Sequence, residues 1–423
     1  MNRIEIRNGR LIDPLNNIDR PASLFIAEGR IASIGSAPEG FAAERIIDAS
    51  GAVVCPGFID LGARLNSIEA ELAAAVAGGV TSVVVPPGTD PPLDEPELAD
   101  RLVHRAADIG RARVLPLGAL TLGLKGERLA ELGGLARAGC VAFSQANRPV
   151  VDTESLMRAL EYAATFGYAV WLQPQDHWLA RNGIAHAGEV ASRLGLAGIP
   201  VSAETIAIAT LVQLARDTGV RLHLTRLSSG AGARLLEVAR SEGVAVTGDV
   251  SIHHLHLTEN DIGYFDSQAR FDPPLRSQSD RQALSDAAAR GVLAICSDHT
   301  PVGADDKLLP FGEAKPGATG LELLLPLTLK WATEAGVSLP KALARITADP
   351  AAILGSDRGQ LAVGAVADVC VFDPEANWRL LPEALRSKGK NTPFLGYELQ
   401  GRVTACLIGG RQVCSGSPVE SSK

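Results

Sequence analysis

Polar and charged residues stand directly after several short apolar runs, where a parallel sheet would gather them at one edge. The residues at these positions are Gly62 and Arg64, Gln145, Gln173, Arg226, and Asp298 and His299; all of them except Gly62 are polar or charged. Imidazole and carboxylate groups at such an edge commonly hold a catalytic metal or act as acid and base. Arg64 and Arg226 instead carry guanidinium groups, which are permanently positive and have no lone pair free for a metal. The positions suit catalysis, but these residue types disfavour a metal-dependent reaction.

The elements that must position these residues alternate between strand and helix over about residues 52–350. The expected strands are Val53–Asp60, Thr81–Val85, Arg113–Leu117, Cys140–Phe143, Ala169–Leu172, Arg221–Leu224, Ala245–Asp249 and Leu293–Cys296. Amphipathic stretches between them include Asp94–Ile109, Thr153–Phe166, Ala203–Thr218 and Arg281–Arg290. Eight such strand–helix units predict an α/β fold, a (β/α)8 TIM barrel whose site lies at the carboxyl ends of the strands.

Both ends of the chain have a different pattern: short predicted strands with alternating residues, separated by turns that contain glycine. Arg3–Arg7 and Asp368–Phe372 are examples, and Asn8-Gly9 is a hairpin signal. We therefore expect a small composite β-domain from residues 1–51 and 351–414, a barrel over 52–350, and a tail at 415–423.

Composition excludes several classes of function. The chain has 423 residues, a net charge of −8 and no basic run, so a nucleic-acid role is disfavoured. Charges at Arg3, Glu5 and Arg7 interrupt any signal peptide, and no apolar segment is long enough to span a bilayer. The 6 cysteines are scattered without a C-x-x-C pair, so we expect buried free thiols. These features predict a soluble cytoplasmic protein.

Short motifs along the chain carry a resemblance to a known family. They are Pro56-Gly57-Phe58-Ile59-Asp60, Ala77-Gly78-Gly79-Val80-Thr81, His253-His254-Leu255, Pro273-Pro274-Leu275-Arg276, Ser297-Asp298-His299-Thr300-Pro301, Gly364-Ala365-Val366-Ala367-Asp368 and Asn391-Thr392-Pro393-Phe394. With them the chain resembles the dihydroorotase branch of the amidohydrolase superfamily nearly end to end. The resemblance implies an amidohydrolase-type barrel with a small β-sandwich formed by both termini.

The resemblance also implies a zinc centre, and here its ligands are replaced. Gly62 and Arg64 stand where active relatives have the two histidines after Pro-Gly-Phe-Ile-Asp. The other vacated metal-ligand positions are Gln145, Gln173 and Arg226, and of the recognised ligands only Asp298 remains. One carboxylate beside two guanidinium groups cannot supply the three or four ligands that zinc needs. We expect no metal cofactor, and we expect Asp298 to pair with Arg64 or Arg226 across the vacated site.

The residues that would hold dihydroorotate are replaced as well. Asn66 stands in place of the arginine that clamps the substrate carboxylate, and Gly88 in place of an asparagine. Asp272 replaces a second asparagine and Val302 a histidine. An anionic substrate that faces Asp272 without its arginine clamp is expected to bind poorly.

Three residues near the expected site could still act as acid or base: Asp298, His254 and His299. His253, His254 and His256 form a cluster, which we interpret as packing and hydrogen-bonding residues at a strand end. We also expect structural roles for Asp298 and His299, because without a metal the aspartate loses its usual role as base.

The first functional hypothesis is a non-catalytic dihydroorotase homologue that serves as a structural subunit. Some bacteria carry such inactive chains in complex with aspartate carbamoyltransferase, the preceding enzyme of pyrimidine biosynthesis. The resemblance implies the catalytic chain of that enzyme as partner, with this chain as a homodimer inside a larger hetero-oligomer.

Two other hypotheses remain open. The chain could be a cyclic-amide hydrolase with a mononuclear or metal-free site that uses Asp298 and His254 as acid and base. General acid–base catalysis alone supplies about 10²–10⁴-fold, which is little for hydrolysis of an amide ring. The third hypothesis is a sensor that binds a pathway metabolite in the vacated pocket.

Overall fold

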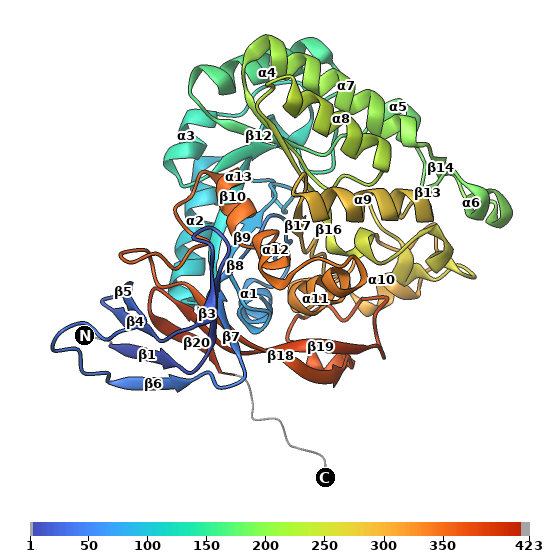
Figure 1. The fold of residues 1–423 in the computed structure, drawn as a ribbon. Coiled ribbons are helices and arrows are strands. Elements are labelled where there is room, and N and C mark those ends of the chain that lie inside the picture. Colours follow the sequence, from blue (N-terminus) through green and yellow to red (C-terminus); the bar gives the residue numbers. More distant parts are fainter. Residues whose placement is uncertain (1–2, 416–423) are drawn as a thin grey trace.

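The largest part of the protein is a ring of eight parallel strands surrounded by helices (Figure 1). The computed structural model describes residues 3–415. In sheet order the barrel strands are β8 (Phe58–Asp60), β9 (Val80–Val85), β10 (Arg113–Ala119), β11 (Ala142–Ser144), β12 (Ala169–Leu172), β15 (Arg221–Leu224), β16 (Val246–Ser251) and β17 (Ala294–Cys296). All neighbouring pairs run parallel. The expected (β/α)8 barrel is confirmed.

The ring is nearly closed between its first and last strands. No ladder joins β8 to β17 in the described residues, but Ala63 and His299 form a parallel bridge just beyond their carboxyl ends. The Arg64 N–H donates to the His299 carbonyl at 2.8 Å. Lower down, the Ile59 N–H donates to the Ile346 carbonyl at 2.9 Å, so the chain near residue 346 fills the seam. The seam therefore ties the loop that carries Arg64 to the loop that carries Asp298.

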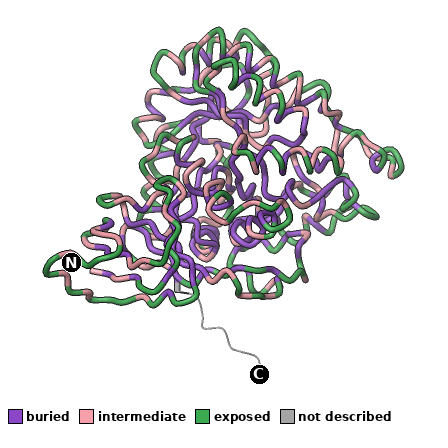
Figure 2. The backbone as a smooth tube through the Cα atoms, viewed as in Figure 1, coloured by how far each residue is buried: buried purple, intermediate pink, exposed green. Residues whose placement is uncertain are grey.

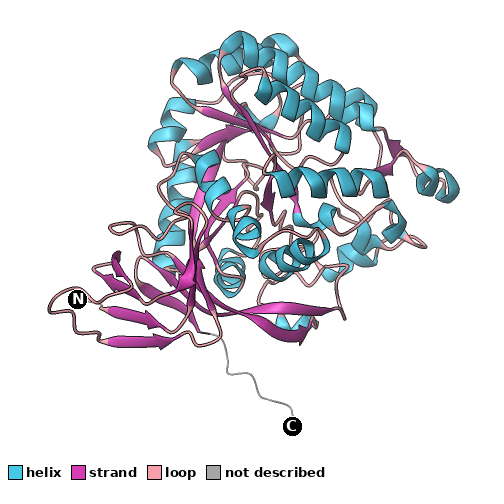
Figure 3. Cartoon of the chain, viewed as in Figure 1, coloured by secondary structure: helices cyan, strands magenta, loops and turns pink. Residues whose placement is uncertain are grey.

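Helices cover the outside of the barrel (Figure 3). They are α1 (Ile68–Ala77), α2 (Pro96–Ile109), α3 (Leu132–Arg137), α4 (Thr153–Thr165), α5 (His177–Ala180), α7 (Val201–Thr218), α8 (Gly230–Ser241), α9 (Gln278–Arg290), α10 (Ala304–Leu308), α11 (Leu324–Glu334), α12 (Leu339–Ala344) and α13 (Ala348–Leu354). Short 3-10 turns are η1 (Leu122–Leu124), η2 (Ile252–Leu255), η3 (Glu259–Ile262), η4 (Ser267–Ala269) and η5 (Pro382–Ala384). Helix α9 shows why the ends fall where they do: the Ser277 side chain caps its first turn, and Gly291 ends it at φ 81°.

Both termini build two sheets that lie below the barrel in Figure 1. The six-stranded sheet has the order β20 (Arg411–Ser415), β19 (Glu398–Ile408), β18 (Val369–Arg379), β7 (Val53–Pro56), β2 (Arg10–Asp13), β3 (Ile18–Pro21). The four-stranded sheet has the order β5 (Arg30–Ile34), β4 (Leu24–Ala27), β1 (Ile4–Arg7), β6 (Arg45–Asp48). A shared apolar core that includes Ile4, Leu11, Val54 and Val371 packs the two sheets together. The expected β-rich domain from both termini is therefore present.

The expectation of one strand over Val53–Asp60 was wrong, because the run divides at Gly57. The first half, β7, pairs with β2 and β18 in the terminal domain, and only β8 belongs to the barrel. A Cβ at Gly57 would lie 2.2 Å from Thr81 Cγ2, so only glycine allows this close approach.

At the other end of the chain, the last described α-helix, α13, reaches Leu354 and the last described strand, β20, reaches Ser415. The expected tail, apart from Ser415, lies outside the described residues.

Buried residues run from the barrel into the terminal domain (Figure 2). A small cluster fills the barrel interior, with Trp171 and Cys296 among its members. All six cysteines are buried and free. Over residues 3–415, no helix is both long enough and apolar enough to cross a membrane.

A small arm leaves the barrel wall between α5 and α7. It consists of β13 (Ala185–His186), α6 (Glu189–Leu194) and β14 (Gly198–Ile199), and α6 stands out at the right of Figure 1. Arg276 fastens its base, because its Nη1 donates to the Ile199 carbonyl at 2.7 Å.

Candidate functional site

Five of the sequence-predicted positions meet at the carboxyl end of the barrel. One small cavity of about 40 Å³ is lined by Gly62, Arg64, Arg226, Asp298 and His299. They come from the chain beyond β8, β15 and β17, where a barrel of this kind places its active site. Arg226 and Asp298 also have left-handed backbones, at φ 55° and 47°. Such backbone costs of order 1–3 kcal/mol for a residue other than glycine, and it concentrates at functional sites.

Arg226 occupies the centre of this cavity and contacts several strand ends at once. Its Nη1 lies 3.3 Å from Asp298 Oδ1 and donates to the Asp272 carbonyl at 3.1 Å. Its Nη2 donates to Asn147 Oδ1 at 2.8 Å and to Gln173 Oε1. The backbone N–H of Arg226 donates to Asp249 Oδ1 at 2.8 Å, which fixes where the side chain starts. Arg226 thus links the strand ends that a metal would otherwise join.

Arg64 reaches the same network from the opposite side. Its Nη2 donates to Asn147 Oδ1 at 2.8 Å, and its Nη1 donates to Thr300 Oγ1 at 3.1 Å. Asn147 Nδ2 donates to Asp272 Oδ2 at 2.6 Å, and Gln173 Nε2 donates to Asp272 Oδ1 at 3.1 Å. Two guanidinium groups and two carboxylates are thereby connected through two amides.

Asn147 was missed by sequence reasoning, although its amide joins both arginines to Asp272. It stands two residues beyond Gln145, after the end of β11. A polar residue just past a barrel strand was the available signal. Asn147 was overlooked because the comparison with active relatives was carried only as far as Gln145 and Ala146.

Burial shapes the ionisation of these charged groups. Burial raises the pKa of Asp298, and the charges of Arg226 and Arg64 offset this only in part. Burial likewise lowers the pKa of Arg64, with the neighbouring charge of Arg226 as the next cause. Both shifts express the cost of keeping charges out of water. Asp298 is thus held by its arginine neighbours and is not placed as a free base.

The residues proposed as remaining acids and bases have other partners. His254 is buried, and its Nε2 lies 3.3 Å from the Pro274 carbonyl. It lines neither of the two cavities that Asp298 lines. His299 Nε2 lies 2.9 Å from Glu71 Oε2, while its Nδ1 accepts the Gly320 N–H at 3.0 Å. Asp298 and His254 are therefore not brought together as an acid–base pair.

The vacated substrate positions surround an outer cavity of about 260 Å³. Asn66, Asp272 and Val302 line it, and Asn66 Nδ2 donates to the Pro301 carbonyl at 2.8 Å. Gly88 is not among the lining residues and instead lies against Ala146. Lys315 also lines this cavity, but its Nζ pairs with Asp306 at 3.0 Å. An anion in this space would face Asp272, Asp298 and Asp306, and also Arg64, whose guanidinium group is already bonded to Asn147 and Thr300.

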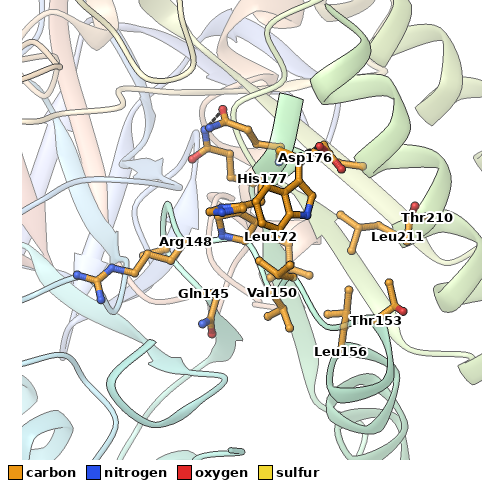
Figure 4. A pocket seen from close by; sticks show the side chains of 17 residues that line it. Gln145, Arg148, Val150, Thr153, Leu156, Leu172, Asp176, His177, Thr210 and Leu211 are labelled. Atoms are coloured by element: carbon orange, nitrogen blue, oxygen red, sulfur yellow. Dashed lines mark hydrogen bonds between the residues drawn. The ribbon is translucent and has the colours of Figure 1, made fainter. Parts of the chain in front are cut away.

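Gln145 turns away from the arginine network. Its side chain contacts Thr121 Oγ1, at 2.8 Å from Nε2. It lines a separate cavity of about 130 Å³ with Leu156, Leu172 and Leu211, seen in Figure 4. Gln173 lines this cavity too, although its amide belongs to the arginine network. The vacated metal-ligand positions thus divide between two spaces.

The side chains at the mouth do not fit a zinc ion. Across residues 3–415 no group of three or more His, Cys, Asp and Glu side chains could hold a metal. The one retained carboxylate, Asp298, is paired with Arg226, and Gly62 offers no donor atom. Guanidinium groups cannot serve as ligands, and at 4 Å their repulsion of a cation is about 4 kcal/mol per pair of unit charges at an effective dielectric of 20.

Comparisons with known proteins agree with this architecture. Residues 51–231 match the Dihydro-orotase-like family, and residues 147–414 match the Amidohydrolase family. A "Dihydroorotase-like protein" of Pseudomonas putida is 44% identical over 98% of this chain and 99% of its own length. A "Dihydroorotase" of Syntrophotalea carbinolica is 40% identical over 97% of this chain and 98% of its own. The chain belongs to the dihydroorotase-like amidohydrolases.

Solved structures of hydantoinases have the same fold as this dihydroorotase-like chain. L-Hydantoinase (Dihydropyrimidinase) from Arthrobacter aurescens superimposes with a TM-score of 0.86 at 23% identity, covering 98% of this chain and 96% of that one. D-Hydantoinase (Dihydropyrimidinase) from a Thermus species gives a TM-score of 0.84 at 20% identity, covering 97% and 95%. At such identities the likeness concerns the fold alone.

Proposed function

We propose that this dihydroorotase-like chain is a non-catalytic, metal-free subunit that holds aspartate carbamoyltransferase in its working assembly. The observation that carries the proposal is the position of Arg226. Its guanidinium group lies at the vacated metal site, with Nη1 3.3 Å from Asp298 Oδ1, and bonds to Asn147 and Gln173. A cation of the protein itself thus takes over the cohesive role of a metal.

The substrate side of the site supports the same proposal. Dihydroorotate is an anion, and the outer cavity presents Asp272 and Asp298 to it. The position expected to clamp its carboxylate holds Asn66, whose amide already donates to the Pro301 carbonyl. The arginine that does line the cavity, Arg64, already donates to Asn147 and Thr300, so a substrate carboxylate would have to compete for it to offset its loss of hydration.

An assembly role is compatible with a site that has lost its chemistry. A barrel whose mouth is closed by its own ion pairs remains a large rigid surface. Contacts with a partner use surface residues, so they persist when residues at the mouth change. Carbamoyltransferase chains of this kind are trimers in the family picture. A closed cytoplasmic complex then requires matched symmetry, most simply equal numbers of both chains with dimeric barrels that bridge trimers.

Hydrolysis by Asp298 and His254 receives no support from the geometry. Asp298 is bonded to Arg226, and His254 is buried beside Pro274. Burial also lowers the pKa of His254 to about 4, so it is neutral near pH 7 and cannot donate a proton as an imidazolium. The two residues line no common cavity among those at the mouth.

The test is to express the carbamoyltransferase catalytic chain with and without this protein. Transcarbamoylase activity is then assayed, and the products are sized by sedimentation velocity. The proposal expects a large hetero-oligomer and full activity only when both chains are present. Full activity and an unchanged mass in the absence of this chain would rule it out.

A further inference from the structure

Four large apolar side chains stand exposed together beside the barrel mouth. Tyr264 is 90% exposed, Leu308 83%, Leu309 42% and Phe265 37%. They come from two loops, one between η3 and η4 and one that includes α10. Scattered exposed apolar residues are ordinary, but four of them on two loops that are hydrogen-bonded to each other make a candidate interaction site. We refer to these four residues as the docking patch.

Buried hydrogen bonds hold the two loops of the docking patch together. Lys307 Nζ donates to the Ser267 carbonyl at 2.9 Å, and Ser267 Oγ donates back to the Lys307 carbonyl. Arg270 Nη1 donates to the Phe311 carbonyl at 2.8 Å, and the Gly317 N–H donates to the Arg270 carbonyl at 2.8 Å. The aromatic rings of Tyr264 and Phe265 also meet edge to face at 5.4 Å. The patch is therefore preformed, which lowers the entropy lost on docking.

Acidic residues surround the docking patch. Asp261, Asp266, Asp305 and Glu313 are exposed around it. The exposed lysine there, Lys315, is already paired with Asp306. In a two-fold contact between copies of this chain through this patch, the acidic rim of one copy would face the acidic rim of the other, and like-charge contacts cost several kcal/mol. A second copy is thus a poor occupant.

The partner that fits is a folded protein with an apolar ridge flanked by lysine and arginine side chains. We infer that the docking patch binds such a partner. The inference rests on the proposed function, in which this partner is the carbamoyltransferase catalytic chain. Helix α10 also carries Asp306, which lines the outer cavity. A partner seated on Leu308 therefore lies beside the entrance that a substrate would need.

The test compares docking-patch variants in complex formation with the carbamoyltransferase chain. The patch variant is Tyr264→Ser with Leu308→Ser. The matched control is Leu15→Ser with Val363→Ser, two apolar residues of the terminal domain that are 53% and 64% exposed. Sedimentation velocity gives the complexed fraction across a concentration series. Equal melting temperatures of the uncomplexed variants confirm that both are folded.

We expect the patch variant to bind roughly ten-fold or more weakly, which corresponds to 1.4 kcal/mol for a central apolar anchor. The control should bind like the natural chain. Asp305→Lys with Glu313→Lys, at two exposed positions, keeps the apolar residues and should also weaken binding, with less salt dependence than the natural chain.

Any of the following three results would overturn the inference. If the natural chain and the patch variant join the complex equally, the docking patch is not the interface, while the assembly role stands. If the natural chain forms no complex, the proposed function and the inference both fail. If the patch variant loses self-association while it keeps the hetero-complex, the patch is a contact between copies of this chain.

Discussion

Arg226 Nη1 lies 3.3 Å from Asp298 Oδ1 at the carboxyl ends of β15 and β17, and both side chains are almost entirely buried. The pair joins the ends of two barrel strands. A buried ion pair is weakly stabilising overall, but breaking it on one side is costly. This asymmetry sets the first prediction.

Arg226→Met should destabilise the protein by about 3–5 kcal/mol, because Asp298 then remains buried without its partner. Arg226→Met with Asp298→Asn should recover part of that loss. Urea unfolding of both single variants and the double variant gives the coupling energy. Additive single and double effects would contradict a coupled pair.

Asn147→Ala should lower the free energy of unfolding by roughly 2 kcal/mol, since it leaves two buried guanidinium groups without a shared acceptor. Asn260→Ala is the control, because Asn260 is exposed. Urea unfolding measures both variants. Equal effects at the two positions would mean that the network adds no stability.

Gly62→His with Arg64→His restores two expected ligands without restoring hydrolysis. Nothing lies within 4 Å of a Cβ at Gly62, so the first change fits the fold. Gln145, Gln173, Arg226, Asn66 and Gly88 still differ from the active pattern. A dihydroorotate hydrolysis assay with added zinc should show no turnover. Measurable turnover would show that fewer replacements separate this site from an active one.

Acidic pH should destabilise the folded protein, because the buried histidines of the 253–256 segment bind protons less tightly than they do in the unfolded chain. Burial lowers the pKa of His253 to about 3 and those of His254 and His256 to about 4. The unfolded chain binds protons more tightly, so stability falls as the pH drops below 6.5. For His254 the full effect is roughly 3 kcal/mol. Burial raises the pKa of Asp60 to about 6, and it also raises the pKa of Asp298, Glu322 and Asp349, so these carboxyl groups oppose part of the histidine effect as the pH falls.

His253→Phe tests this acid dependence directly. Neither ring nitrogen of His253 has a hydrogen-bond partner, and its ring stacks 5.9 Å from that of Phe394. The variant should lose less stability than the natural chain between pH 6.5 and 4, as followed by urea unfolding at each pH. His177→Gln, at an exposed position outside this segment, is the control and should leave the pH profile close to that of the natural chain. Identical profiles for His253→Phe and the natural chain would refute the assignment.

Sequence patterns predicted the barrel strands well where tertiary contacts reinforce local ones. Ala169–Leu172 and Arg221–Leu224 were predicted with the bounds they have, because the first is a continuous apolar run, the second alternates polar and apolar residues, and each is followed by a polar residue. The division at Gly57 depends on a close approach to Thr81 far along the chain, and no local pattern contains that contact. The arm with α6 was also unforeseen.

The position of the candidate site could be predicted from the sequence, but the hydrogen-bond partners within it could not. Asp298 was expected to pair with Arg64 or Arg226, and the structure shows the pair with Arg226. That Gln145 turns to Thr121 while Gln173 turns to Asp272 depends on loop conformations that residue types do not encode. The central place of Asn147 likewise appears only when the loops are folded.

Metal content tests the central claim most directly. The protein is produced in zinc-supplemented medium, dialysed without chelator, and measured by elemental analysis, with a zinc-dependent hydrolase prepared alongside as positive control. The arginine network predicts zinc far below about one ion per chain, because Arg226 and Arg64 occupy the place of the ligands. About one or more zinc ions per chain that survive dialysis would contradict it.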